Sequence, residues 1–163
     1  MIILGIDPGT RITGYGIIRD EDGKISCIEY GAIKNPQKLT PWECQLRIFD
    51  GMSKIVKEYA IDAVAVESQF FYKNARTALR LAEARSVALL SATRAGLPIF
   101  EYAPKRVKQA VSGTGSARKD QVQLMVGVLL KISGTITPED AADALGIAIT
   151  HAHSRRLSAM LNG

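Results

Sequence analysis

The hydrophobic pattern of the first third of the chain predicts three short strands. An apolar run over 1–7 ends at Asp7 and is followed by a Pro-Gly turn signal. Apolar-rich segments at 15–19 and 25–33 come next, joined through an Asp-Gly dipeptide at 22–23 that favours tight hairpins. We therefore expect an antiparallel meander of three strands.

The remainder of the chain alternates between helical and strand patterns. Thr40 before Pro41 is a typical helix start. Behind it, one apolar stripe recurs every three or four positions: Trp42, Leu46, Phe49, Met52, Val56 and Tyr59. Helices are predicted at about 40–59, 74–96, 118–131 and 137–153, and a further helix begins at 104 and ends before a loop at 112–116. Strands are predicted at 62–67 and 98–102.

This order of elements predicts an α/β fold. Three antiparallel strands lead, and strands that alternate with helices follow, which is typical of a mixed five-stranded sheet with helices on both faces. The chain has 163 residues, too few for two lobes with separate cores. We expect a single domain over 1–163, with a short tail from about 154.

Composition indicates a globular protein of a reducing compartment. Hydrophobic residues make up 47% of the chain and charged residues 23%. No apolar run is long enough for a transmembrane helix, and the first residues lack a basic leader, so we expect a cytoplasmic protein without a membrane partner. Cys27 and Cys44 have no metal-like spacing and are expected to be free thiols.

The net charge of +5 is unevenly distributed. The segment from Lys73 to Lys119 carries ten basic and two acidic residues, so the rest of the chain is net acidic. A basic segment of this kind fits a polyanionic partner such as a nucleic acid. A solvated helix surface explains the charge equally well.

Four acids interrupt apolar elements and are candidates for metal chemistry. Asp7 and Glu67 each end a predicted strand, and Asp143 lies in a nearly all-apolar helical segment, where a charge is costly unless it is paired. Asp140 lies three residues before Asp143, on the same helix face. Because ligands of open α/β sheets bind at the carboxyl ends of strands, these oxygens predict a Mg²⁺ site.

Each acid also has a plain structural interpretation. Asp7 fits a turn, Glu67 fits a strand end that reaches water, and Asp140 fits the favourable dipole of a helix start. Asp143 is the hardest to explain in this way. His151 lies about 16 Å along the helix from Asp140, too far to share a metal with it.

Four segments in this order and spacing resemble the RuvC Holliday-junction resolvases of bacteria: GIDPGTRITGYGII, AVAVESQFFYKN, VKQAVSGTGSARKDQV and DAADALGIAITH. The resemblance covers about residues 2–153. It implies a ribonuclease-H-like fold and a homodimer that cuts four-way DNA junctions symmetrically in recombination and repair. It also implies RuvA and RuvB as branch-migration partners.

The resemblance also implies roles for particular residues. The catalytic, metal-binding acids of the family fall on Asp7, Glu67, Asp140 and Asp143. Lys108 and Lys119 match lysines near the scissile phosphate, with Lys119 as a catalytic residue. Phe70 matches an aromatic that enters the junction and unstacks bases, although it would also fit a core position. Lys73 and Arg118, in the same basic segment, are expected to contact DNA.

Together these features predict hydrolysis of a phosphodiester bond with two Mg²⁺ ions per subunit, which Mn²⁺ can replace. The helix at 74–95 is a candidate dimer surface because its many alanines permit close approach; the alternative is that they pack on the sheet. Two other functions stay open. One is a ribonuclease-H-like nuclease acting on RNA or RNA–DNA hybrids, and the other is a non-catalytic junction-binding module.

Overall fold

The computed structural model describes residues 1–68 and 74–161. The strands are β1 (Ile2–Asp7), β2 (Ile12–Glu21), β3 (Lys24–Lys34), β4 (Ala63–Glu67) and β5 (Ile99–Tyr102). The helices are α1 (Pro41–Glu58), α2 (Ala75–Arg94), α3 (Pro104–Ser112), α4 (Lys119–Leu130) and α5 (Glu139–Leu161). The predicted order of elements is confirmed.

The five strands form one mixed sheet in the order β3-β2-β1-β4-β5. β1, β2 and β3 pair antiparallel, whereas β4 and β5 run parallel to β1. Asp22 and Gly23 turn the β2–β3 hairpin with φ values of 49° and 89°, the left-handed conformation that this turn requires. The predicted meander is therefore confirmed.

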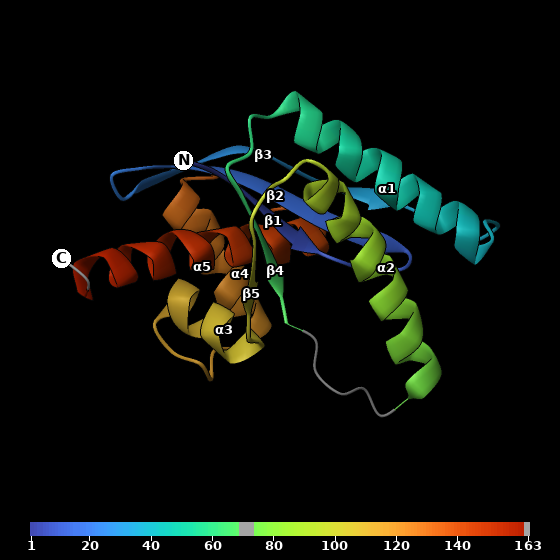
Figure 1. Ribbon diagram of the computed structural model, residues 1–163. Coiled ribbons are helices and arrows are strands. Elements are labelled where there is room, and N and C mark those ends of the chain that lie inside the picture. The colour runs from blue at the N-terminus through green and yellow to red at the C-terminus, as the bar shows by residue number, and fades with distance from the viewer. Residues whose placement is uncertain (69–73, 162–163) are drawn as a thin grey trace.

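Alternating side chains divide the core between the two faces of the sheet. Ile3 and Ile18 pack with α3, α4 and α5, whereas Leu4 and Ile17 pack with α1 and α2. Figure 1 shows the same division, with α1 and α2 on one side of the sheet and α5 on the other. The prediction of helices on both faces is confirmed.

Two helix starts have the caps that the sequence predicts. The Thr40 hydroxyl accepts a hydrogen bond from Glu43 N, and the Glu43 carboxylate accepts one from Thr40 N, which forms a capping box. Asn74 caps α2 by accepting a hydrogen bond from Thr77 N. These caps fix where α1 and α2 begin.

Glycines in β1 and β2 let α5 pack unusually close to the sheet. A Cβ at Gly5 would lie 2.0 Å from the Ala144 carbonyl oxygen, and one at Gly14 would lie 2.0 Å from that of Asp140. Both carbonyls belong to the α5 backbone, which cannot give way as a flexible side chain can. The absence of side chains at these two positions therefore sets the distance between α5 and the sheet.

The last helix differs from its prediction at the C-terminal end. It does not end near 153 but continues to Leu161, so residues 154–161 are helical and not a tail. Arg155 donates to the fully buried Asp20 carboxylate at 3.1 Å, and Arg156 donates to the Gly23 carbonyl at 3.2 Å. These contacts with the β2–β3 hairpin hold the added turns of helix in place.

Two further expectations concern the cysteines and the membrane. Cys27 and Cys44 are free thiols, as predicted. Among the described helices, we find none with the length and hydrophobicity of a membrane span.

Gly5→Ala tests the close approach of α5. The added methyl group would collide with helix backbone, so we expect a loss of about 1–3 kcal/mol or more in the free energy of unfolding, measured by chemical denaturation. Gly127→Ala is the matched control: it lies within α4, where the nearest atom to the new Cβ is 3.7 Å away. Since alanine favours a helix by about 1 kcal/mol over glycine, this control should be neutral or stabilising. Equal effects of the two variants would contradict the account.

Candidate active site

Carboxylates from three elements converge beside the carboxyl ends of two parallel strands. β1 and β4 pair with Ile6 opposite Val66, which brings the strand ends at Asp7 and Glu67 together. By alternation both side chains lie on the α5 side of the sheet, as Gly5 and Ala65 do. Asp143 reaches the same place from the second turn of α5.

These three acids line a pocket of about 230 Å³ with two lysines, Lys108 from α3 and Lys119 from the start of α4. The remaining lining residues are Pro104, Val107, Val122, Gly146 and Ile147. The wall is thus largely apolar, and the charged groups are concentrated at one place. The apolar wall strengthens the electrostatic interactions of the buried acids, whereas the Lys119 side chain is 57% exposed.

Asp140 lies one helical turn before Asp143 on α5. It is not among the residues that line the pocket, but its negative charge contributes to the raised pKa of Asp7. The close contact between Gly14 and the Asp140 backbone fixes this turn beside β2. All four predicted acids therefore lie close enough together for the other three to raise the pKa of Asp7.

The burial of Asp7 raises its pKa from 3.8 to about 7. The negative charges of Asp143, Asp140 and Glu67 add to this shift, and Lys119 opposes it. Burial also raises the pKa of Glu67, with a further contribution from Asp143, while Lys108 and Lys119 lower it. Crowded carboxylates of this kind bind protons or cations more tightly than isolated ones.

Lys119 forms the main ion pairs of the pocket. Its Nζ lies 2.9 Å from Asp143 Oδ2 and 3.4 Å from Glu139 Oε1. Burial lowers the pKa of the Lys119 ammonium, but the hydrogen bond and charge of Asp143, with those of Glu139, outweigh it and raise the pKa overall. The sequence analysis did not identify Glu139, although its position in the first turn of a helix beside Asp140 was visible.

The donor set of the site fits a hard divalent cation. All of its acidic donors are carboxylate oxygens. Burial and the repulsion of the neighbouring carboxylates raise the pKa of Asp7, and a bound cation would stabilise its charge against both. Within 1–68 and 74–161, no three acid, histidine or cysteine side chains already form a metal cage. In this structure the Lys119 ammonium balances the negative charge of Asp143.

Only some of the residues predicted to contact DNA line the pocket. Lys108 and Lys119 line the pocket, whereas Arg118 is exposed and pairs with Asp120 through two hydrogen bonds of 2.9 and 3.1 Å. Phe70 and Lys73 lie outside the described residues.

His151 belongs to a different environment from the carboxylates. Its Nδ1 lies 2.7 Å from the Tyr102 hydroxyl, and its ring centroid is 4.3 Å from that of Phe100. Burial lowers the pKa of His151, with a further contribution from Arg155. These contacts explain the histidine as a packing residue between α5 and β5.

Comparison with known proteins identifies the family. The family model described as "Crossover junction endodeoxyribonuclease RuvC" matches residues 3–151. The chain belongs to the RuvC family. The predicted family resemblance is thereby confirmed.

Relatives of the RuvC family match over the full chain. The RuvC of Syntrophomonas wolfei is 48% identical over 99% of this chain and 94% of its own length. The RuvC of Geobacter sp. strain M21 is also 48% identical, over 100% of this chain and 99% of its own length.

Solved structures confirm the ribonuclease-H-like fold expected of the family. A structure titled "T. thermophilus RuvC in complex with Holliday junction substrate" has a TM-score of 0.91 and 34% identity, and covers 97% of this chain and 96% of its own. The yeast mitochondrial Holliday junction resolvase Ydc2, with a TM-score of 0.64 and 14% identity over 94% of this chain and 80% of its own, shares the fold.

Asp7→Asn should stabilise the metal-free protein, and more so at high pH. Folding raises the pKa of Asp7 to about 7, so above that pH the folded state holds a carboxylate that would be more stable in the unfolded chain. At about 1.4 kcal/mol per pKa unit, the gain should approach about 4 kcal/mol at pH 8 and fall toward zero near pH 4. Thermal unfolding at pH 5 and 8, with Asp50→Asn on the exposed side of α1 as control, measures it. A gain that does not increase with pH would contradict the account.

Proposed function

We propose that this chain is a structure-selective endonuclease that cuts four-way DNA junctions by hydrolysing phosphodiester bonds, in DNA recombination and repair. The observation that carries the proposal is the pocket in which Asp7, Glu67 and Asp143 face Lys108 and Lys119. The names and titles of the relatives, among them a RuvC bound to a Holliday junction, support this substrate.

The four acids would hold Mg²⁺, two ions per subunit, with Mn²⁺ as a substitute. Asp7 and Glu67 act from strand ends, and Asp140 and Asp143 from one face of α5. When bound, such ions activate a water molecule and stabilise the leaving oxygen. The carboxylates therefore serve as ligands and must be ionised, so protons compete with the metal for them and metal binding weakens as the pH falls.

The lysines of the pocket would bind the phosphate that is cut. Lys108 lines the pocket near enough to Glu67 for its charge to lower the pKa of that acid, and Lys119 already lies against Asp143. A phosphate oxygen entering the pocket would compete with the Asp143 carboxylate for the Lys119 ammonium. Lys119 would then stabilise the charge that develops on the phosphate as the bond breaks.

We infer further DNA contacts from the basic segment between Lys73 and Lys119. We assign Lys73 and Arg118 to contacts with DNA phosphates. Phe70 would enter the junction and unstack bases, since an apolar side chain inserted between base steps offsets part of the unstacking cost of a few kcal/mol.

A homodimer would match the near two-fold symmetry of the junction. Helix α2 is the proposed contact surface, but its alanines do not all contribute, because Ala84, Ala88 and Ala92 are buried in the core. The exposed side of α2 instead presents Leu79 and Leu90, which are 66% and 54% exposed and lie three turns apart on one stripe. RuvA and RuvB would supply branch migration in the cytoplasm.

Glu67→Gln should abolish nicking of a labelled four-way junction in Mg²⁺ while junction binding remains. The amide keeps the size of the side chain but lacks the charge that a hard cation requires. Glu58→Gln, at an exposed position at the end of α1, makes the same charge change and should cleave like the wild type.

The same assay with a linear duplex and an RNA–DNA hybrid separates the alternatives. Preference for the hybrid would indicate a ribonuclease-H-like nuclease, and junction binding without cleavage would indicate a non-catalytic module. Near-normal cleavage by Glu67→Gln would contradict the four-acid site.

A further inference from the structure

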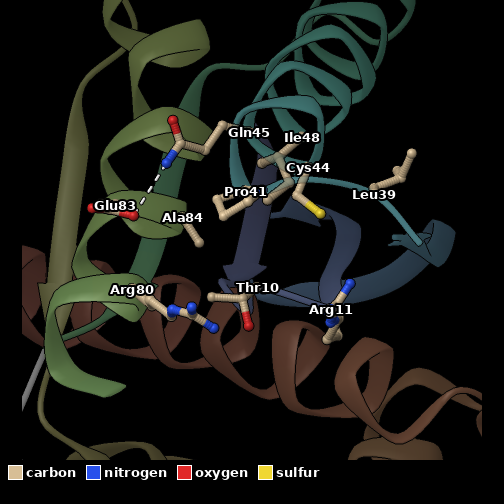
Figure 2. Close-up of a pocket in the computed structure, with 10 residues that line it drawn as sticks. All are labelled: Thr10, Arg11, Leu39, Pro41, Cys44, Gln45, Ile48, Arg80, Glu83 and Ala84. Carbon is tan, nitrogen blue, oxygen red and sulfur yellow. Dashed lines mark hydrogen bonds between the residues drawn. The ribbon is translucent and has the colours of Figure 1, made fainter. Parts of the chain in front are cut away.

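A second pocket lies on the other face of the sheet from the carboxylates. It has a volume of about 160 Å³ and is formed by the loop after β1, the start of α1 and one side of α2. Figure 2 shows Arg80 reaching from α2 toward Thr10, with Arg11 on the other side of Thr10. Two guanidinium groups and a hydroxyl thus share one pocket, beside apolar side chains such as Leu39 and Ile48.

The loop that carries Thr10 and Arg11 is held in place by its neighbours. Asn35, only 6% exposed, donates from its side chain to the Thr10 carbonyl at 2.9 Å and from its backbone to the Arg11 carbonyl at 2.8 Å. Arg11 Nη1 donates to the Pro36 carbonyl at 3.0 Å. The position of this loop is therefore fixed before any ligand arrives, which lowers the entropic cost of binding.

The charge of the pocket favours an anion. Over 1–68 and 74–161, neither Arg11 nor Arg80 forms an ion pair with a carboxylate. Glu83 also lines the pocket, where its carboxylate accepts a hydrogen bond from Gln45 Nε2 at 3.2 Å, so two positive charges outnumber one negative charge (Figure 2). Two arginines and one threonine hydroxyl match the donors that phosphate groups prefer.

The pocket is close enough to the carboxylates to bind the same DNA molecule. Thr10 is three positions after Asp7, so their Cα atoms lie at most about 11 Å apart. Duplex DNA carries one phosphate charge per ~1.7 Å of its axis, and on the order of six charges fall within that length. A DNA strand held at the carboxylates therefore has other phosphates within reach of Arg11 and Arg80.

We propose that Thr10, Arg11 and Arg80 form a binding site for a DNA backbone phosphate other than the one that is cut. This inference rests on the proposed nuclease function and adds to it a contact that positions the junction on the far side of β1. A backbone phosphate carries no sequence information, so this contact would position the junction without reading its sequence. Arg11 lies outside the basic segment that the sequence analysis identified.

The test is the salt dependence of junction binding by the full chain without divalent ions. The slope of log affinity against log salt is about −0.9 for each phosphate neutralised. The double variant Arg11→Gln/Arg80→Gln should flatten this slope by about one for each protomer bound. Arg11→Lys/Arg80→Lys, which keeps both charges, should retain most of the slope. Lys54→Gln/Lys57→Gln, which removes two charges at exposed positions of α1 outside the basic segment, is the control for net charge and should change it much less.

Two results would overturn the proposal. One is an unchanged slope in the glutamine double variant. The other is weaker binding with an unchanged slope, which would mean that the pocket holds an uncharged group or supports the fold. Thermal unfolding and sedimentation of each variant show that the fold and the oligomeric state are retained.

Junction nicking by the wild type in Mg²⁺ separates the two proposals. If the wild type nicks junctions but the slope does not change, only the phosphate site fails. If the wild type neither nicks nor binds junctions, the proposed function fails and this inference fails with it.

Discussion

The close contact between α5 and the glycines of β1 and β2 determines where the acids of the site lie. At Gly5 and Gly14, a side chain would collide with the α5 backbone, so the helix packs directly on the sheet. This contact places the first two turns of α5, which carry Asp140 and Asp143, beside the ends of β1 and β4. Without it, Asp7 and Glu67 would face an empty edge of the sheet.

Bringing these acids together makes the site electrostatically unfavourable in the absence of a cation. Burial raises the pKa of Asp7 and of Glu67 most, the neighbouring carboxylates raise both further, and the charge of Lys119 offsets part of this effect. Stability and function therefore oppose each other at this site: the carboxylates that would bind metal weaken the fold that holds them. The packing of α5 along the sheet, which the contact between Arg155 and Asp20 extends, stabilises the fold against the electrostatic cost of the clustered acids.

Local sequence signals predicted much of the architecture. The Asp-Gly turn, the Thr40 cap and the acids at the two strand ends each depend on neighbours within a few residues, and the structure confirms their positions. The length of α5 could not be predicted in this way, because Arg155 finds Asp20 across 135 positions of the chain. The glycines of β1 and β2 were visible, but only the packed helix explains them. Phe70 and Lys73 lie outside the described residues, so the assignment of Phe70 rests on the family resemblance and that of Lys73 on the basic segment.

Carbon-detected NMR titration of the Asp7 carboxyl in the metal-free protein measures whether the acids share one crowded, buried site. If α5 holds its acids against β1, Asp7 should titrate near pH 7 in the wild type. Its midpoint should fall in Asp143→Asn, because the charge of Asp143 helps to raise the pKa. A midpoint near pH 4 in both proteins would show that the carboxylates do not share a crowded, buried site, and would contradict the account.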